Sequence, residues 1–290
     1  MRIGHYQAVC NPGDFEANLA KVVEGLERAK HERVAILCFP ECFLTGYYST
    51  EKASRRTGFA ADSAKMRKIL CCTKRFDTTF IVGFNELRGK HLYNTALVAR
   101  RGKLLGLYSK SSAYMKFHTQ GRDFPVFKHD GITFGVVICS DGGYIEPTRI
   151  LALKGARIVF APHYNYIRKE GLINHFMKVR ADHVSRAVEN DIWFVRGNQV
   201  TIGRDKGLDS DGVGYGDSYI LDPKGEIIVR SRRHQEDFIF ADVDAKVTDI
   251  GWGVGRSRWS AREFGQLLIE AAAQKPRPDK ASRRAHRVRP

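Results

Sequence analysis

Short apolar runs rich in β-branched and aromatic residues alternate with helical patterns along most of this chain. The strand-like runs cover residues 34–39, 79–84, 95–99, 133–139, 157–161, 192–196, 218–221 and 238–243. They are apolar rather than strictly alternating, which is typical of strands buried on both faces. Because helical patterns separate them, the sequence predicts an α/β fold whose sheets are covered by helices.

Spacing and end signals indicate helices between these runs. The first helix carries an apolar stripe at the i, i+3, i+4, i+7 spacing, made of Leu19, Val22, Val23, Leu26 and Ala29. Asp14 is its candidate N-cap. A second pattern covers about 148–154 and stops at Gly155, and a third covers about 171–189.

Composition excludes several classes of protein. Of the 290 residues, 43% are hydrophobic and 28% are charged, close to globular averages, which excludes collagen-like and wholly disordered chains. No apolar run approaches the roughly 20 residues of a membrane span, and the N-terminus lacks the apolar core of a signal peptide. We therefore expect a soluble, cytoplasmic protein without membrane partners.

The six cysteines lie mostly inside apolar runs, which favours reduced thiols over a disulfide framework. Neither a paired C-x-x-C nor an H-E-x-x-H motif is present, so the sequence predicts no metal site. No cofactor is expected either.

Positive charge is concentrated at the C-terminus. The chain has 48 basic and 32 acidic residues, and residues 275–290 hold seven of the basic and one of the acidic ones. This proline-containing tail is expected to be disordered. It is either a solvated tail or an arm that touches nucleic acid or another anionic surface. The predicted organisation is one domain over 1–265, a helix end or linker over 266–274, and the basic tail over 275–290.

Three reactive side chains stand at the ends of predicted strands. Glu41 follows the run 34–39, Lys110 ends the segment 104–110, and Cys139 closes the run 133–139 before a helix. Reactive groups in α/β folds gather at such carboxyl ends. A helix N-terminus or a nearby ammonium lowers a thiol pKa from about 8.5, so Cys139 would be activated if Lys110 is close. A carboxylate beside it could take the thiol proton and return it to a leaving amine.

From the residues alone, interpretations without a catalytic role stay open. Cys139 could be a small buried core residue, Glu41 a loop or cap carboxylate, and Lys110 a surface charge.

These segments resemble, in order, the three signatures of the nitrilase superfamily of carbon–nitrogen hydrolases. The matching segments are Phe-Pro-Glu-Cys-Phe-Leu-Thr-Gly-Tyr at 39–47, Leu-Tyr-Ser-Lys at 107–110 and Ile-Cys-Ser-Asp-Gly-Gly-Tyr-Ile-Glu at 138–146. Further similarity lies at 152–156, 186–190, Asn198, 216–225 and 262–264. The resemblance therefore covers about residues 1–265.

The resemblance implies a four-layer αββα sandwich, usually assembled into homodimers or larger homo-oligomers. It implies that Cys139 attacks a carbonyl carbon to form a thioester and that Glu41 is the general base. Lys110 and the backbone N–H of Ser140 would hold the oxyanion. The candidate substrate-binding residues are Tyr47, Tyr114, Gly143, Tyr144, His163 and Asn165.

The residues after the nucleophile indicate the substrate class. Ser140-Asp141 is similar to the amidase and carbamoylase branches, whereas nitrile-hydrolysing members typically have Trp-Glu. The expected substrate is therefore a small amide or N-carbamoyl compound, and a nitrile is the alternative. The excess of positive charge favours anionic N-carbamoyl amino acids, with Arg168 and Arg180 as candidate pocket arginines.

Two departures from the family pattern leave another alternative open. No Glu lies between Lys110 and Cys139, and Tyr114 falls where many members carry a second Glu. A phenol does not readily carry negative charge near neutral pH. Lys110 is also followed by Ser-Ser instead of x-His-Leu, which leaves Lys116 as a rival. The alternative is a catalytically weakened interaction protein of the same fold that binds nucleic acid through its tail.

Overall fold

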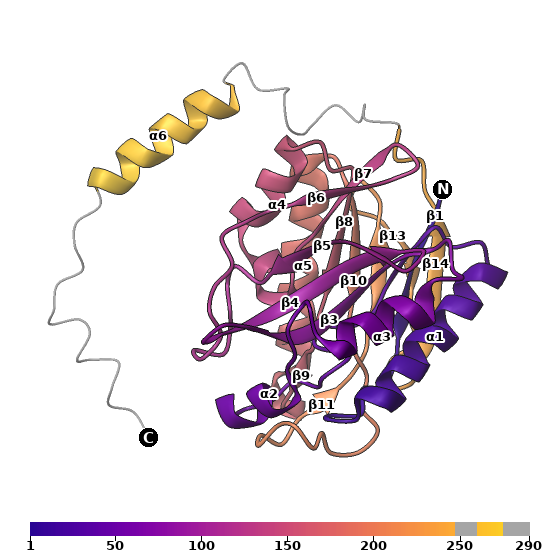
Figure 1. Cartoon of the computed structure of the whole chain (residues 1–290). Helices are drawn as coiled ribbons and strands as arrows, with labels where there is room; N and C mark the ends of the chain where they lie inside the picture. Colours follow the sequence, from indigo (N-terminus) through magenta and orange to yellow (C-terminus); the bar gives the residue numbers. More distant parts are fainter. Residues whose placement is uncertain (247–259, 275–290) are drawn as a thin grey trace, which may run out of the picture. The chain divides into compact units, whose positions relative to one another are not determined.

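The computed structural model describes residues 1–246 and 260–274 (Figure 1). The chain divides into two compact units, Met1–Gly253 and Val254–Pro290. The described part of the second unit contains α6 (Ala261–Gln274). The expected basic tail lies outside the described residues. The expected boundary at residue 265 falls inside α6, and the domain limits stay a prediction.

Within residues 1–246, two six-stranded sheets form the first unit. The first sheet contains, in spatial order, β14 (Asp237–Asp242), β1 (Arg2–Gln7), β2 (Ile36–Cys38), β3 (Thr79–Arg88), β4 (His91–Arg100) and β5 (Lys103–Ser109). The second contains β13 (Ile227–Arg230), β12 (Tyr219–Leu221), β10 (Trp193–Gly197), β8 (Ile158–Pro162), β7 (Ile132–Val136) and β6 (Val126–His129). A short pair joins β9 (Tyr166–Ile167) to β11 (Val213–Gly214).

The two sheets share one order of strand pairing. Read from β14 in the first and from β6 in the second, the order is antiparallel, parallel, parallel, antiparallel, antiparallel. The parallel pairs lie inside each sheet, where helices can cover them. The loops after β2, β7 and β8 therefore stand at carboxyl ends of parallel strands.

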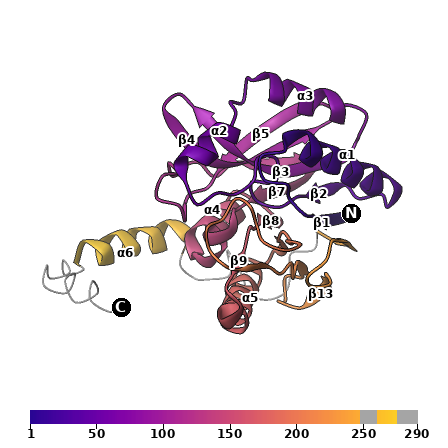
Figure 2. The same ribbon diagram turned by 90° about the horizontal axis from the view of Figure 1, so that it is seen from below.

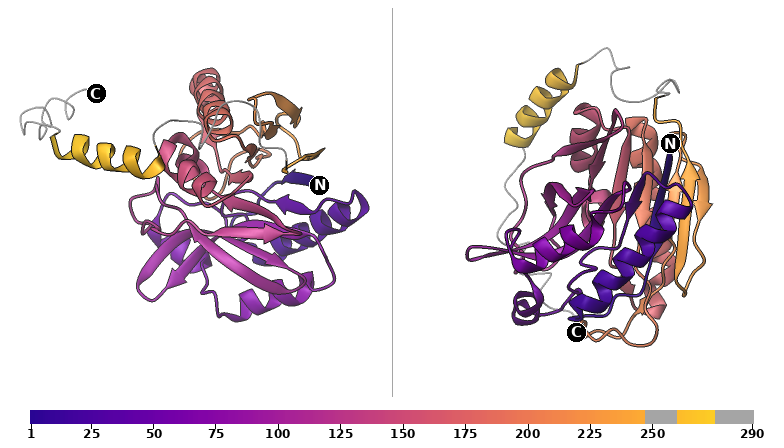
Figure 3. Two further views of the ribbon diagram at one scale, coloured as in Figure 1. Left: turned by 90° about the horizontal axis from the view of Figure 1, so that it is seen from above. Right: turned by 45° about the vertical axis from the view of Figure 1, so that its right-hand side comes forward.

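Helices cover the outer face of each sheet. The helical segments of this unit are α1 (Phe15–His31), α2 (Glu51–Thr57), α3 (Ala64–Thr73), η1 (Cys139–Gly143), α4 (Ile145–Leu153), η2 (Lys169–Gly171) and α5 (Leu172–Asn190). Figure 2 and the left view of Figure 3 show α1 and α3 on one side of the strands and α4 and α5 on the other. This arrangement is the αββα sandwich, which confirms the predicted fold class.

The period-two pattern of strand side chains divides the core between the layers. In β2, Ile36 and Cys38 pack between the sheets against residues such as Phe134 and Phe160. The intervening Leu37 packs with the outer helices. Both faces of these strands are thus buried, which explains their continuous apolar runs.

The predicted strands and helices are present, with shifted ends. The Asp14 carboxylate caps α1 by accepting a hydrogen bond from the Ala17 N–H at 3.0 Å. Gly155 follows α4 with φ +90°, a backbone conformation that favours glycine. Strand β7 ends at Val136, earlier than predicted, because Cys139 already belongs to the turn η1.

None of the helices in the described ranges is both long and apolar enough to cross a membrane.

Candidate active site

The three reactive residues predicted from the sequence come together from both sheets. Glu41 follows β2 and Lys110 follows β5 in the first sheet, whereas Cys139 follows β7 in the second. Glu41 and Cys139 line a cavity of about 700 Å³, and Lys110 contacts Glu41. The rival Lys116 is exposed and does not line this cavity.

Glu41 and Lys110 form a buried ion pair. The Lys110 ammonium donates to Glu41 Oε1 at 2.7 Å, and each side chain is 1% exposed. The Asn94 amide donates to the same oxygen at 2.7 Å, whereas Glu41 Oε2 is buried without a hydrogen-bond partner among the described residues. Burial alone would lower the pKa of Lys110, but the charge of Glu41 and those of the ionisable groups around it together outweigh burial and hold this pKa well above its ordinary value.

Cys139 begins a sharp turn between β7 and α4. Its φ of +48° lies in the left-handed region that non-glycine residues rarely adopt. Such strained positions cluster at functional sites. The next residue, Ser140, anchors the turn by donating its hydroxyl to the Ser112 carbonyl oxygen at 2.6 Å.

The pKa of the Cys139 thiol differs from what the sequence predicts. Burial and then the Glu41 charge raise its pKa to about 12, and Lys110 offsets only part of this effect. The expectation of a lowered pKa was wrong because burial, together with the charge of the Glu41 carboxylate that pairs with Lys110, outweighs the effect of the ammonium. The thiol is therefore protonated near neutral pH.

Asp141 joins the loop after Lys110 to the turn that begins at Cys139. Its fully buried carboxylate accepts four hydrogen bonds, from the Tyr108 hydroxyl at 2.7 Å, the Ser111 hydroxyl at 2.9 Å, the Ser112 N–H at 2.7 Å and the Ile138 N–H at 3.0 Å. Two of these donors come from the loop that follows β5. Asp141 thereby fixes the segments that carry Lys110 and Cys139 relative to each other, a role that sequence reasoning missed.

All six candidate substrate-binding residues line the cavity: Tyr47, Tyr114, Gly143, Tyr144, His163 and Asn165. Tyr47 is buried and stacks on Tyr164 with the ring centroids 5.3 Å apart. Tyr114 and Tyr144 are 76% and 55% exposed. Burial, followed by the Arg196 charge, holds the pKa of His163 well below its ordinary value, so this ring is neutral. Their roles toward a substrate stay a prediction.

Sequence reasoning missed the wall that α5 contributes. The α5 residues that face the cavity are His175, Lys178, Val179, Asp182 and His183. Their i, i+3, i+4 spacing indicates one helix face, but the spacing does not tell what that face covers. The candidate pocket arginines Arg168 and Arg180 are not among the described residues that line this cavity.

Lys110 is paired with a carboxylate even though no second Glu lies between Lys110 and Cys139. Tyr114 stands at the exposed rim of the cavity, and Lys110 is paired by Glu41. Asp141, from the turn that begins at Cys139, also raises the pKa of Lys110 through its charge. The departure at Tyr114 therefore leaves the ammonium paired and charged.

A family model described as carbon-nitrogen hydrolase matches residues 2–250 of the chain. The chain belongs to the carbon-nitrogen hydrolase family. The resemblance to the nitrilase superfamily drawn from the three signature segments is confirmed by this match. This carbon-nitrogen hydrolase therefore carries its Glu41, Lys110 and Cys139 side chains on the fold expected for them.

Curated relatives with different activities are similar to this hydrolase. The glutamine-dependent NAD(+) synthetase of Thermotoga maritima is 29% identical over 253 residues, which cover 82% of this chain and 41% of the synthetase. The chain thus spans about two fifths of that relative. The N-carbamoylputrescine amidase of Solanum tuberosum is 28% identical over 265 residues, covering 84% of this chain and 88% of that enzyme.

A solved structure has the same fold. The amidase from Nesterenkonia sp. superposes with a TM-score of 0.72 at 22% identity, covering 84% of this chain and 90% of that one. A further structure of a mutant of the Nesterenkonia sp. AN1 amidase shows covalent addition of the acetamide moiety of fluoroacetamide at that protein's active-site cysteine.

Proposed function

We propose that this carbon-nitrogen hydrolase cleaves a small amide or N-carbamoyl substrate through a thioester on Cys139 and releases ammonia. The observation that carries the proposal is the buried Glu41–Lys110 ion pair beside the Cys139 thiol, in a cavity of about 700 Å³, which is large enough for a small molecule. The unpartnered Oε2 of Glu41 supplies an acceptor for the thiol proton.

In the first half of the reaction, Glu41 takes the Cys139 proton and the sulfur attacks the carbonyl carbon. The carbonyl oxygen becomes an oxyanion, held by the Lys110 ammonium and the backbone N–H of Ser140. The first N–H groups of a helical turn lack acceptors within it, so the Ser140 N–H suits this role. Glu41 then protonates the leaving nitrogen, the C–N bond breaks, and ammonia and the thioester remain.

In the second half, a water molecule attacks the thioester carbon while Glu41 accepts its proton. The same oxyanion donors serve again, the C–S bond breaks, and Glu41 returns the proton to the sulfur. One carboxylate thus acts alternately as base and acid in both halves.

The charges in the cavity favour a substrate without net charge. Among the described residues, Glu41 is paired with Lys110, and Lys178 is paired with Asp182 at 2.8 Å. The rest of the wall is largely aromatic and uncharged. An uncharged amide, or a zwitterionic ω-amide that matches the Lys178–Asp182 pair, therefore suits the cavity better than the anionic N-carbamoyl amino acids favoured by the net charge.

The deciding experiment is ammonia release from butyramide, glutamine, an N-carbamoyl amino acid and a simple nitrile. Cys139→Ala is expected to abolish release while circular dichroism stays unchanged. Cys71→Ala, at an exposed cysteine on α3, is the matched control and is expected to retain full activity. Release that persists in Cys139→Ala would overturn the nucleophile assignment.

The same assay separates the alternatives. A nitrile-hydrolysing enzyme would release ammonia from the nitrile and leave the amides unchanged. An interaction protein with weakened catalysis would be inactive on the whole panel. Deletion of residues 275–290 would then abolish a salt-sensitive complex with nucleic acid.

A further inference from the structure

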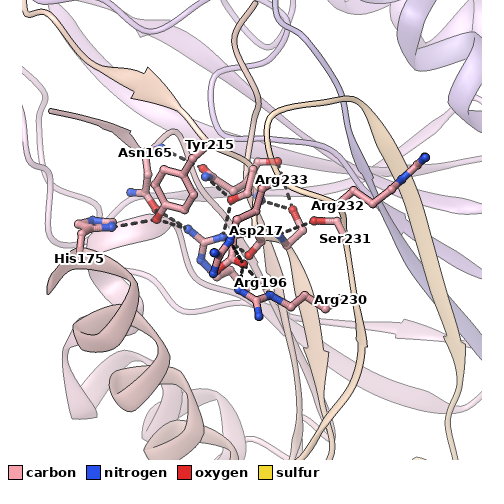
Figure 4. A network of polar contacts seen from close by, with 12 residues as sticks. Asn165, His175, Arg196, Tyr215, Asp217, Arg230, Ser231, Arg232 and Arg233 are labelled. Atoms are coloured by element: carbon pink, nitrogen blue, oxygen red, sulfur yellow. Dashed lines mark hydrogen bonds and ion pairs between the residues drawn. The ribbon is translucent and has the colours of Figure 1, made fainter. Parts of the chain in front are cut away.

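Arg196, on β10, is buried among neutral acceptors. It is 1% exposed and contacts Asn165, which lines the cavity; Figure 4 shows the polar contacts around it. Its Nη1 donates to the backbone carbonyl oxygens of Gly216 and Asp217. Its Nη2 donates to Asn165 Oδ1 at 2.7 Å and to the Tyr215 hydroxyl at 2.8 Å.

The carboxylate of Asp217 lies near Arg196 but pairs with other arginines. The Asp217 side chain forms ion pairs with Arg230 and Arg233, and Arg196 forms none among the described residues. A buried charge without a counter-ion is costly. The neutral acceptors around Arg196 therefore stabilise its positive charge only through their dipoles. In return, the hydrogen bonds from the guanidinium orient these acceptors.

Asn165 is the acceptor that connects Arg196 to the reaction site. A guanidinium has donors and no acceptor, so the Asn165 amide must turn its oxygen toward Arg196. The Tyr215 hydroxyl lies 3.5 Å from the same oxygen, and the Asn165 backbone N–H donates to Asn198 Oδ1 at 2.9 Å. The other end of the amide, Nδ2, then points to Cys139 Sγ at 3.5 Å.

We propose that Arg196 is a positioning residue that fixes the Asn165 amide with its N–H groups directed at the Cys139 sulfur. This inference rests on the proposed role of Cys139 as nucleophile. A donor aimed at the sulfur stabilises the thiolate more than the thiol. The Asn165 amide and Lys110 thus oppose the burial and the Glu41 charge that keep the thiol protonated.

The test measures Cys139 reactivity without turnover. Iodoacetamide alkylation is followed at pH 8 on the whole protein, with the Cys139 peptide quantified by mass spectrometry. Below the thiol pKa the rate follows the thiolate fraction. Arg196→Met is expected to slow alkylation roughly tenfold, as expected for the loss of a hydrogen bond to a charged group.

Combining two substitutions distinguishes a role of Arg196 in positioning the Asn165 amide from a direct effect of the Arg196 charge on the thiol. Asn165→Leu removes the donor and keeps the guanidinium, and it is expected to slow alkylation as much as Arg196→Met. The combined variant is expected to show no further loss, because both changes act through one amide. Additive losses would overturn the proposal in favour of a direct effect of the charge.

Matched variants guard against a purely structural effect. Arg230→Met removes a neighbouring arginine that pairs with Asp217, and alkylation of Cys139 is expected to stay unchanged. If Arg196→Met does not fold, Asn165→Asp decides, because it keeps the Arg196 contact and turns an acceptor toward the sulfur. Unchanged alkylation in the folded Asn165 variants would overturn the proposal.

The alkylation assay also separates this inference from the proposed function. If the wild-type protein releases no ammonia but the alkylation rates change as expected, the proposed function fails and the positioning role stands. If ammonia release depends on Cys139 but the rates do not depend on Arg196, the opposite holds.

Discussion

At Glu41, the two oxygens of one carboxylate have different surroundings. Oε1 accepts hydrogen bonds from Lys110 and Asn94, both at 2.7 Å, whereas Oε2 is buried without a partner among the described residues. Leaving a buried acceptor unsatisfied is unfavourable by about 1–3 kcal/mol. In the proposed reaction this oxygen receives the thiol proton, so the site keeps an acceptor ready at the cost of some stability.

Replacing Glu41 by Gln is expected to affect hydrolysis and thiol reactivity in opposite directions. Loss of the base lowers kcat/KM roughly 10²- to 10⁴-fold. The Glu41 charge raises the pKa of Cys139, so its removal lowers this pKa and speeds iodoacetamide alkylation at pH 8. Steady-state kinetics and peptide mass spectrometry measure the two effects.

Glu86→Gln is the control, because Glu86 is also a buried carboxylate but pairs with Arg88 and does not line the cavity. Its hydrolysis rate is expected to stay near that of the wild type. Equal losses in both variants would contradict a specific role of Glu41.

At the scale of single elements, β3 supports the loop that carries Glu41 through a glycine. A methyl group added at Gly83 would lie 2.2 Å from the Cys42 backbone nitrogen and 2.8 Å from the Glu41 carbonyl carbon. The Leu44 N–H donates to the Gly83 carbonyl oxygen at 3.0 Å, so strand and loop are tied at this point. The position of Glu41 therefore depends on a residue without a side chain.

Gly83→Ala is expected to displace this loop. Because the clash is with backbone atoms, the free energy of unfolding should fall by about 3 kcal/mol, as for other overpacked sites. The value of kcat/KM should fall at least about tenfold, because small displacements of reacting groups are costly. Urea unfolding and ammonia release measure both effects.

In the matched variant Gly171→Ala, the nearest atom to the new methyl is 3.6 Å away, so little change is expected. If Gly83→Ala keeps wild-type activity and stability, the loop that carries Glu41 accommodates the methyl group and the prediction is contradicted.

At the scale of the whole first unit, the packing of one sheet on the other buries His5 and keeps its imidazole neutral. His5, on β1, is fully buried, and its Nε2–H donates to the Asn198 carbonyl oxygen at 3.0 Å, beyond the end of β10. Burial, with a smaller contribution from the Arg196 charge, lowers the pKa of His5 to about 4. Protonation of His5 therefore opposes the packing of one sheet on the other.

Stability is expected to fall as the pH drops from about 6.5 to about 4. In this window the unfolded chain binds a proton at His5 that the folded protein does not, so the stability present above pH 6.5 is lost. The loss due to His5 amounts to about 3 kcal/mol. His5→Gln should flatten this part of the curve in urea unfolding measured at several pH values.

His31→Gln serves as the control, because the His31 side chain is 84% exposed, and it should leave the curve unchanged. A curve equally steep in His5→Gln and in the wild type would assign the pH dependence to other groups.

Much of the architecture follows from local patterns. The run from Val34 to Phe39 and the spacing of Leu19, Val22 and Leu26 report the periods of a buried strand and an amphipathic helix. The rule that reactive groups follow strand ends draws attention to Glu41, Lys110 and Cys139, but only the resemblance of the signature segments favoured them as a catalytic set. The four-layer arrangement came from the resemblance of the signature segments, since period alone does not tell how two sheets pack.

The sequence by itself thus determined the alternation of strands and helices, the family and the chemical types at the site. Only the tertiary structure decided the protonation of Cys139, the wall contributed by α5 and the contact of Arg196 with Asn165. The reason is physical. Periodicity and residue type act between neighbours in the chain, whereas desolvation and charge pairing depend on distances between residues far apart in it.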